Sequence, residues 1–203
     1  SRDLLQKIVR ENVSNDSFKF RDSRKMFVAG VPAIVNRISF TGELGYEIYV
    51  APHFQLKLYE ELTKAGKEFN IKPFGGRALM SMRLEKNWGA WTLDYRPDFT
   101  AKETGLDAFI NWDKDFIGKD SAKKDESKNK LVPLIVETND IDVTYNEAVL
   151  KGDKSIGYIT SGGFAHFVNK SIAFSYVDQN ELKSEKGIQV EINGDFFNCS
   201  IIK

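Results

Sequence analysis

The fold is decided by residues 37–50, which read RISFTGELGYEIYV. Apolar residues alternate with polar ones on both sides of a glycine-containing centre, and this period of two is the pattern of β-strands. Gly42 and Gly45 can adopt the positive φ angles that a tight connection requires. We therefore predict a first strand that contains Ile38 and Phe40, then a turn, then a second strand that completes the stretch.

Glu47 is the exceptional residue of this stretch, because it lies between the apolar residues Tyr46 and Ile48. An ionised carboxylate in an apolar environment costs on the order of several kcal/mol unless it is hydrogen-bonded or paired. Two explanations are open. Glu47 points to solvent from a half-exposed strand, or it is a ligand-binding carboxylate held on a rigid strand.

Three blocks in this order resemble the folate-binding aminomethyltransferase family, which includes the glycine cleavage T-protein. Residues 37–50 resemble the strand–turn–strand signature of that family. Residues 75–86, GGRALMSMRLEK, resemble its G-x-R-x-x-x-x-x-R-L-E helix. Residues 157–163, GYITSGG, together with residues 170–173, KSIA, resemble its C-terminal strands. The resemblance covers nearly the whole chain.

Further details resemble one branch of the family, the dimethylglycine and sarcosine dehydrogenases. They are residues 161–166, SGGFAH, residues 85–91, EKNWGAW, and residues 140–143, DIDV. In that branch a flavin domain precedes the folate domain. Because the resemblance begins partway into the family pattern, we expect the chain to be a C-terminal piece of a longer polypeptide. The chain contains no G-x-G-x-x-G fingerprint, so FAD is expected in the missing N-terminal part.

The resemblance implies three folate-binding residues. Glu47 matches the family carboxylate that accepts two parallel hydrogen bonds from a reduced pterin, a geometry that suits a carboxylate. Phe40 stands where the family often carries Tyr, so it keeps an aromatic contact without the hydroxyl. Arg77 matches a folate-contacting arginine. A surface role remains open for Arg77, although a cation in the first turn of a helix is unfavourable for the helix dipole.

The resemblance supplies no catalytic residue, because the Asp that is the proposed acid/base of the family lies upstream of Ser1 in the aligned pattern. In the C-terminal block the T-protein has a folate-contacting arginine. Around Asp142 and Glu147 this sequence has no arginine, so that contact is not expected.

The implied function is that of the tetrahydrofolate-binding C-terminal portion of a flavin-dependent dimethylglycine/sarcosine dehydrogenase-like enzyme. The flavin would oxidise an N-methyl glycine derivative, and the one-carbon unit would pass to N5 of tetrahydrofolate. The fragment alone is expected to be inactive, and its partners are folate and the missing N-terminal half. The alternatives are a stand-alone T-protein-like aminomethyltransferase, a non-catalytic folate-binding or scaffold protein of the same fold, and a plain β interaction module.

Composition narrows the other possibilities. Lys+Arg and Asp+Glu both number 29, so net charge gives no support for a nucleic-acid or anionic-lipid partner. Cys199 is the single cysteine and the only histidines are His53 and His166, which excludes a Cys/His zinc site; no metal is expected. No apolar run approaches the ~20 residues that span a bilayer. We expect a cytoplasmic protein if bacterial, a mitochondrial matrix protein if eukaryotic, and no secretion.

We predict an α+β protein with two parts. Residues 1–128 are expected to form part of the folate-binding aminomethyltransferase domain, an antiparallel sheet with helices, and residues 129–203 a small β-barrel. The boundary rests on the charged segment 119–130 and on the short alternating strands that follow it. Expected helices cover residues 1–11, 53–69 and 77–86, the second with an apolar stripe of Phe54, Leu56, Leu58, Tyr59 and Leu62. Expected strands cover residues 26–29, 31–39, 131–136, 148–150, 156–160, 172–177, 188–192 and 196–202, with Asn193-Gly194 as a hairpin turn.

Overall fold

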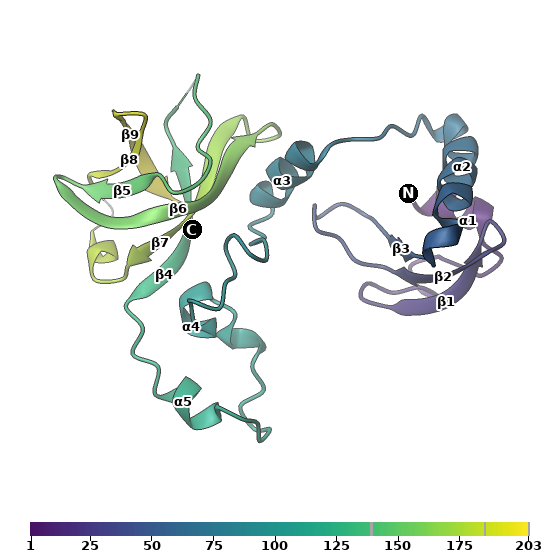
Figure 1. The fold of residues 1–203 in the computed structure, drawn as a ribbon, viewed down its shortest axis with the longest axis horizontal. Helices are drawn as coiled ribbons and strands as arrows, with labels where there is room; N and C mark the ends of the chain where they lie inside the picture. The colour runs from purple at the N-terminus through teal and green to yellow at the C-terminus, as the bar shows by residue number, and fades with distance from the viewer. Residues whose placement is uncertain (139, 185, 203) are drawn as a thin grey trace. The chain divides into compact units, whose positions relative to one another are not determined.

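The computed structural model describes residues 1–138, 140–184 and 186–202. The chain divides into two compact units, residues 1–79 and residues 80–203, which are described separately (Figure 1). None of the helices in the described part of the chain has the length and apolar character that crossing a membrane requires.

The first unit is a three-stranded antiparallel sheet with two α-helices packed together. Its elements are α1 Arg2–Ile8, β1 Ser23–Val28, β2 Val31–Asn36, β3 Glu47–Tyr49, the 3-10 helices η1 Pro52–Phe54 and η2 Lys67–Phe69, and α2 Gln55–Gly66 between them. The strand order is β1-β2-β3 (Figure 1). The buried residues are Leu5, Val9, Val13, Phe18, Met26, Val28, Ala33, Val35 and Leu58.

The connection between β1 and β2 is a two-residue turn at Ala29 and Gly30, whose φ angles are 50° and 78°. Positive φ at both central residues gives the twist that joins two antiparallel strands tightly. The register that follows sets Val28 opposite Val31 and Lys25 opposite Ile34.

The first strand predicted from residues 37–50 is wrong, because Ile38 and Phe40 lie outside any strand. The strand that pairs with β3 is β2, which ends at Asn36. Beyond the end of β2, backbone hydrogen bonds continue for one residue. The Arg37 N–H donates to the Asp22 carbonyl at 2.9 Å, and the Arg37 carbonyl accepts from the Arg21 N–H at 2.8 Å. Arg21 has φ 70° and turns the preceding chain away. Beyond Arg37, residues 38–46 pair with no described strand and form an irregular connection.

The predicted helix over residues 53–69 is present as η1, α2 and η2, but its apolar stripe is narrower than predicted. Leu58 is buried and Leu62 packs against the same core. Leu56 and Tyr59 are 68% and 61% exposed. Leu58 and Leu62, four residues apart, share the helix face that contacts the core, whereas Leu56 and Tyr59 lie on other faces of the helix.

The second unit contains a closed six-stranded barrel, as the sequence predicts. Its strands are β4 Asn129–Val136, β5 Ala148–Lys151, β6 Lys154–Ala165, β7 Lys170–Asp178, β8 Ile188–Ile192 and β9 Asp195–Ile201, in the barrel order β4-β7-β6-β5-β8-β9 (Figure 1). The helical elements are α4 Ala101–Thr104, η3 Asp107–Phe109, α5 Lys119–Lys123 and η4 Glu181–Lys183. The core includes Val132, Leu134, Val136, Val149, Ile159, Ala173, Val177 and Val190.

The helix α3, Gly76–Glu85, begins in the first unit and ends in the second. Its C-terminal half is fixed to the barrel. The Ser81 hydroxyl donates to the Phe164 carbonyl at 2.5 Å, Leu84 packs with Ile172 and Phe174, and the Glu85 carboxylate accepts from the Phe167 N–H at 2.7 Å. The compact units thus divide between Leu79 and Met80, and the predicted domain boundary near residue 128 stays a prediction.

Candidate functional site

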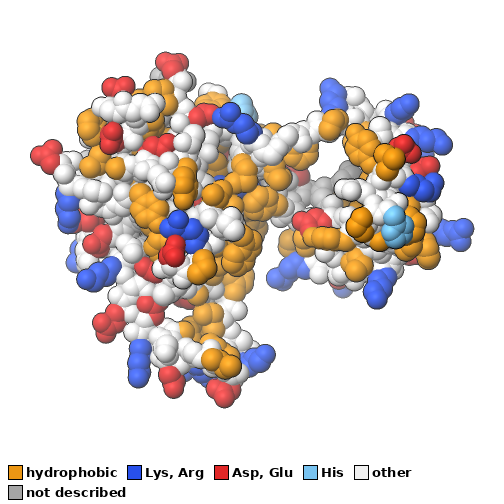
Figure 2. Space-filling model, in the orientation of Figure 1, with side chains coloured by type: hydrophobic (Ala, Val, Ile, Leu, Met, Phe, Trp, Pro, Cys, Tyr) orange, Lys and Arg blue, Asp and Glu red, His pale blue; other side chains and the backbone are white. Residues whose placement is uncertain are grey.

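The outer face of the three-stranded sheet, the face turned away from the core, is the candidate site. Alternation along β1 and β2 buries every second residue and leaves the others outward. The outer face consists of Ser23, Lys25, Phe27, Pro32, Ile34, Asn36, Glu47 and Tyr49. Phe27, Ile34 and Tyr49 are 60%, 41% and 55% exposed, so this face is both apolar and open. Apolar side chains are also visible at the surface of this unit in Figure 2.

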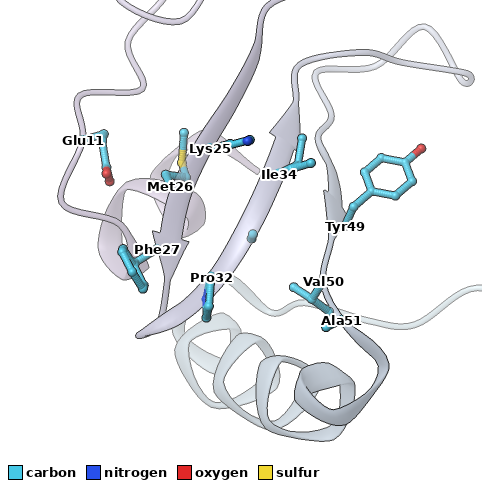
Figure 3. A pocket seen from close by; sticks show the side chains of 10 residues that line it. Glu11, Lys25, Met26, Phe27, Pro32, Ile34, Tyr49, Val50 and Ala51 are labelled. Carbon is cyan, nitrogen blue, oxygen red and sulfur yellow. The ribbon is translucent and has the colours of Figure 1, made fainter.

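The apolar part of the outer face borders a hollow of about 670 Å³. Figure 3 shows its residues, with Ile34 and Tyr49 projecting from neighbouring strands. It is lined by Glu11, Lys25, Met26, Phe27, Pro32, Ala33, Ile34, Tyr49, Val50 and Ala51. Ile34 stands directly opposite Tyr49 in the sheet register, so the two side chains form one cross-strand contact surface.

A polar row lies next to these residues on the same face. Asn36 stands opposite Ser23 on one side and opposite Glu47 on the other. Residues paired in this way have their Cβ atoms about 4.5–5.5 Å apart. The row therefore places a hydroxyl, an amide and a carboxylate side by side across the three strands.

The Glu47 side chain is half-buried, and its carboxylate accepts a hydrogen bond from the Tyr49 hydroxyl. That hydrogen bond, followed by the charge of the carboxylate and by burial, raises the pKa of Tyr49. Glu47 is thus neither buried in the core nor freely solvated. It lies at the edge of the apolar surface and is held by the next outward residue of its own strand.

Unsatisfied polar atoms concentrate in the residues that lead to Glu47. Among the described residues, the buried side-chain atoms without a hydrogen-bond partner include Asn36 Oδ1, Arg37 Nε, Ser39 Oγ and Tyr46 Oη. Buried polar atoms nearly always have partners, so a cluster of orphans requires an explanation such as a ligand or an ordered water. Glu47 follows directly after these residues, so residues 36–47 are the candidate binding region.

The structure places the three predicted site residues in different settings. Phe40 is half-buried in the connection before β3, in the same unit as Glu47. Arg77 is exposed in the first turn of α3. All three residues belong to the first unit, residues 1–79, and their sharing of one binding site stays a prediction.

Sequence reasoning missed Asn36 and Tyr49, although each has a signal in the chain. Tyr49 lies two residues after Glu47, the spacing of one strand face. Asn36 is recognised as a neighbour of Glu47 only when β2 is known to pair with β3. The prediction that a strand through Ile38 and Phe40 pairs with β3 therefore missed it. Within the described part of the chain no group of three or more His, Cys, Asp or Glu is placed to hold a metal ion.

The fold matches that of about half of a solved aminomethyltransferase. The aminomethyltransferase T of the glycine cleavage system from Bartonella henselae superimposes with a TM-score of 0.74 and 24% sequence identity, over 84% of this chain and 48% of that one. A family model described as the GCVT N-terminal domain matches residues 1–114, and one described as the glycine cleavage T-protein C-terminal barrel domain matches residues 129–203. The chain therefore belongs to the glycine cleavage T-protein family.

Three relatives are longer than this chain. Human mitochondrial dimethylglycine dehydrogenase is 36% identical over all of this chain, which spans 24% of its length. Mouse mitochondrial sarcosine dehydrogenase is 31% identical over 87% of this chain and 20% of its own length. Aminomethyltransferase from Caldanaerobacter subterraneus subsp. tengcongensis is 33% identical over 95% of this chain and 51% of its own length.

Proposed function

We propose that the chain forms the tetrahydrofolate-binding portion of a flavin-dependent dimethylglycine/sarcosine dehydrogenase-like enzyme, in which a one-carbon unit passes to tetrahydrofolate. The observation that carries the proposal is the position of Glu47, a half-buried carboxylate on the outer face beside an apolar surface. The match to human dimethylglycine dehydrogenase over 100% of this chain supports the choice of branch.

The residues of the outer face fit a reduced pterin. Its pyrimidine half is flat and has an edge with two parallel N–H donors, at N3 and at the 2-amino group. One carboxylate accepts both, and two charge-assisted hydrogen bonds are stronger than two neutral ones. Apolar side chains such as Ile34 can cover a ring face. When bound, tetrahydrofolate supplies the N5 atom that takes the one-carbon unit.

Each predicted residue has one task in this proposal. Glu47 holds the amino edge of the pterin and fixes its orientation. Phe40 contributes a ring contact without the hydroxyl hydrogen bond of a tyrosine. Arg77 provides a cation for an oxygen-rich group of the ligand, a role that the planar guanidinium group performs well. Glu47 and Phe40 thereby orient the ligand, and no proton transfer is assigned to a residue of this chain.

The remainder of a longer polypeptide is proposed to cover the outer face. The exposed fractions of Phe27 and Tyr49, 60% and 55%, belong to a contiguous apolar surface of the kind that marks an interaction site. This chain spans about a quarter of the length of the matched dimethylglycine dehydrogenases. FAD would be held by that additional part, and the 203 residues alone would be inactive.

A stand-alone aminomethyltransferase is the second candidate. It is favoured by the 33% identity to the Caldanaerobacter protein, of which this chain spans 51%. The natural polypeptide that carries this chain distinguishes the two functions. Bound flavin and oxidation of dimethylglycine or sarcosine support the dehydrogenase, whereas a flavin-free protein that is active only with a lipoyl-bound aminomethyl donor supports the aminomethyltransferase.

Isothermal titration of folinic acid against the natural polypeptide tests the folate site. We expect binding to the wild type and an affinity about 10- to 100-fold lower for Glu47→Gln, because hydrogen bonds to a charged group contribute roughly 1.5–3 kcal/mol. Glu60→Gln, at an exposed position of α2, serves as the matched control and should bind like the wild type. Equal affinities of the wild type and Glu47→Gln would remove Glu47 from the site.

A further inference from the structure

Asn36 is the central residue of the polar row, and the function above leaves it unused. It stands directly opposite Glu47 in the β2–β3 register, and its Oδ1 atom is buried without a hydrogen-bond partner among the described residues. A buried amide oxygen without a donor costs roughly 1–3 kcal/mol. The fold thus retains an energetically unfavourable, unpaired acceptor next to the carboxylate proposed to bind the pterin.

Tyr49 is the neighbouring side chain on this face that a ligand could displace. Its hydroxyl donates to the Glu47 carboxylate, so its ring extends along β3 toward the row that holds Asn36. Asn36 and Tyr49 are diagonal neighbours on one face, since Asn36 pairs with Glu47 and Ile34 pairs with Tyr49. Diagonal partners about 7–8 Å apart are within reach of an aromatic side chain. More than half of Tyr49 is exposed, which leaves its ring room to swing away.

We propose that Asn36 is a second polar contact of the pterin ring, uncovered when the ligand displaces the Tyr49 hydroxyl from Glu47. This inference rests on the proposed folate function. The carboxylate of Glu47 accepts N3–H and one hydrogen of the 2-amino group. The second hydrogen of that amino group points away from the carboxylate, and the Oδ1 atom of the cross-strand neighbour accepts it. In the free protein the Tyr49 hydroxyl donates a hydrogen bond to the Glu47 carboxylate, and the N–H donors of the ligand replace that hydrogen bond on binding.

The chemistry makes the pair selective. A carboxylate alone accepts any two parallel donors, whereas the added amide oxygen requires a primary amino group with a second hydrogen. A site with a buried acceptor rejects ligands that lack the donor, because the acceptor is then left unpaired. Asn36 would therefore discriminate a 2-amino-4-oxo pterin from a ring whose amino nitrogen carries a substituent.

Titration calorimetry with two probes, applied to the natural polypeptide and a set of its variants, tests the inference. The probes are folinic acid and its analogue with one methyl group on the 2-amino nitrogen. Asn36→Ala should bind folinic acid roughly 3- to 10-fold more weakly than the wild type, the loss of one neutral hydrogen bond. Tyr49→Phe keeps the ring but removes the competing hydroxyl, and should bind about 2- to 5-fold more tightly.

The methylated analogue supplies the specific readout. Its methyl group should weaken binding to the wild type about 10-fold. The methyl group should have little effect on the affinity of Asn36→Ala, because alanine lacks the amide oxygen that accepts the hydrogen bond and leaves space for the methyl group. Asn36→Val, with a residue that favours strands, replaces Asn36→Ala if the latter fails to fold. Asn198→Ala, on an exposed position of β9, is the control for asparagine removal.

The outcomes separate this inference from the proposed function. A wild type that does not bind folinic acid overturns both. A wild type that binds, with Glu47→Gln weakened but Asn36→Ala unchanged, retains the folate site and overturns the role of Asn36. Equal or weaker binding by Tyr49→Phe overturns the displacement. Opposite changes in Asn36→Ala and Tyr49→Phe, with the methyl effect confined to proteins that carry Asn36, support the inference.

Discussion

Arg83 and Asp94 form an ion pair in the second unit, with 2.6 Å between Nη1 and Oδ2 and no exposed surface on either side chain. Arg83 lies on α3, and Asp94 lies in the loop that follows it. The Asp94 carboxylate also accepts hydrogen bonds from the Ala90 N–H and from the hydroxyls of Thr160 and Ser161 on β6. Burial lowers the pKa of Arg83, and the charge of Asp94 opposes this shift. The pair therefore joins helix, loop and barrel into one unit.

Removal of one partner of this pair should destabilise the second unit strongly. We expect Asp94→Ala to lower its free energy of unfolding by about 3–5 kcal/mol, because the Arg83 charge stays buried without its counterion. All three tryptophans, Trp88, Trp91 and Trp112, belong to this unit, so tryptophan fluorescence in a urea titration reports its unfolding.

Lys154→Met is the control for this experiment. The Lys154–Glu181 pair is solvent-exposed on the lysine side, with 66% exposure of Lys154, and exposed ion pairs contribute little to stability. Equal unfolding midpoints for Asp94→Ala and Lys154→Met would show that the buried pair does not hold the loop on the barrel.

Gly157 and Gly163 lie in the same strand of the barrel but should differ in their tolerance of an added methyl group. A Cβ at Gly157 would lie 2.0 Å from the Tyr176 carbonyl oxygen, whereas a Cβ at Gly163 would lie 3.7 Å from Leu84 Cδ1. Gly157→Ala must push β6 away from β7, and overpacking of this kind costs about 1–3 kcal/mol or more. Gly163→Ala should be close to neutral, and the same fluorescence titration compares the two variants. A stable Gly157→Ala variant would contradict the close approach of the two strands.

The parts of the fold that local chemistry determines could be predicted from the sequence. Tyr46, Ile48 and Val50 alternate with polar residues and pack against the core of the first unit. Asn193-Gly194 has φ angles of 54° and 91°, the positive values that a two-residue hairpin turn requires. In both places neighbouring residues alone specify the conformation.

The partner strand of β3 could not be predicted, because pairing depends on a distant segment. Residues 37–40 alternate like a strand, yet β1 begins only at Ser23, and Arg21, with its positive φ, turns the earlier chain away. The side-chain period repeats along the chain whether or not a neighbour exists to pair with it. This error concealed Asn36, since its place opposite Glu47 follows only from the true register.

Cys199 should be unreactive in the folded protein. It is buried on β9, and burial is the main cause that raises its pKa from 9.0 to about 12. At pH 8 this shift lowers the thiolate fraction about a thousandfold, and the thiolate is the reactive form. Ellman's reagent should therefore detect one thiol in denaturant and react far more slowly under native conditions.

The same pKa shift gives the direction of a stability change at alkaline pH. The folded thiol has the higher pKa, so the folded state retains its proton where the unfolded state loses it. The contribution to stability is complete below about pH 9 and is lost as the pH rises toward 12. A Cys199→Ser variant should lose less stability than the wild type between these pH values, as measured by urea titration. For the labelling experiment, rapid reaction of Cys199 with Ellman's reagent in the folded protein at pH 8 would contradict the burial of the thiol.

Ala29 offers a route to stabilise the first unit. Its φ of 50° lies in the left-handed region, which a Cβ makes unfavourable and glycine adopts freely. Ala29→Gly should therefore stabilise the β1–β2 hairpin by about 0.5–1 kcal/mol, since the strain relieved in the folded state exceeds the added freedom of the unfolded chain. Ala33→Gly, at a buried position of β2, should have the opposite effect, because glycine weakens a strand interior. Hydrogen exchange of the β1 and β2 amides measures both changes within one hairpin: slower exchange in Ala29→Gly and faster exchange in Ala33→Gly is the expected pair, and slower exchange in neither variant would mean that the turn is not strained.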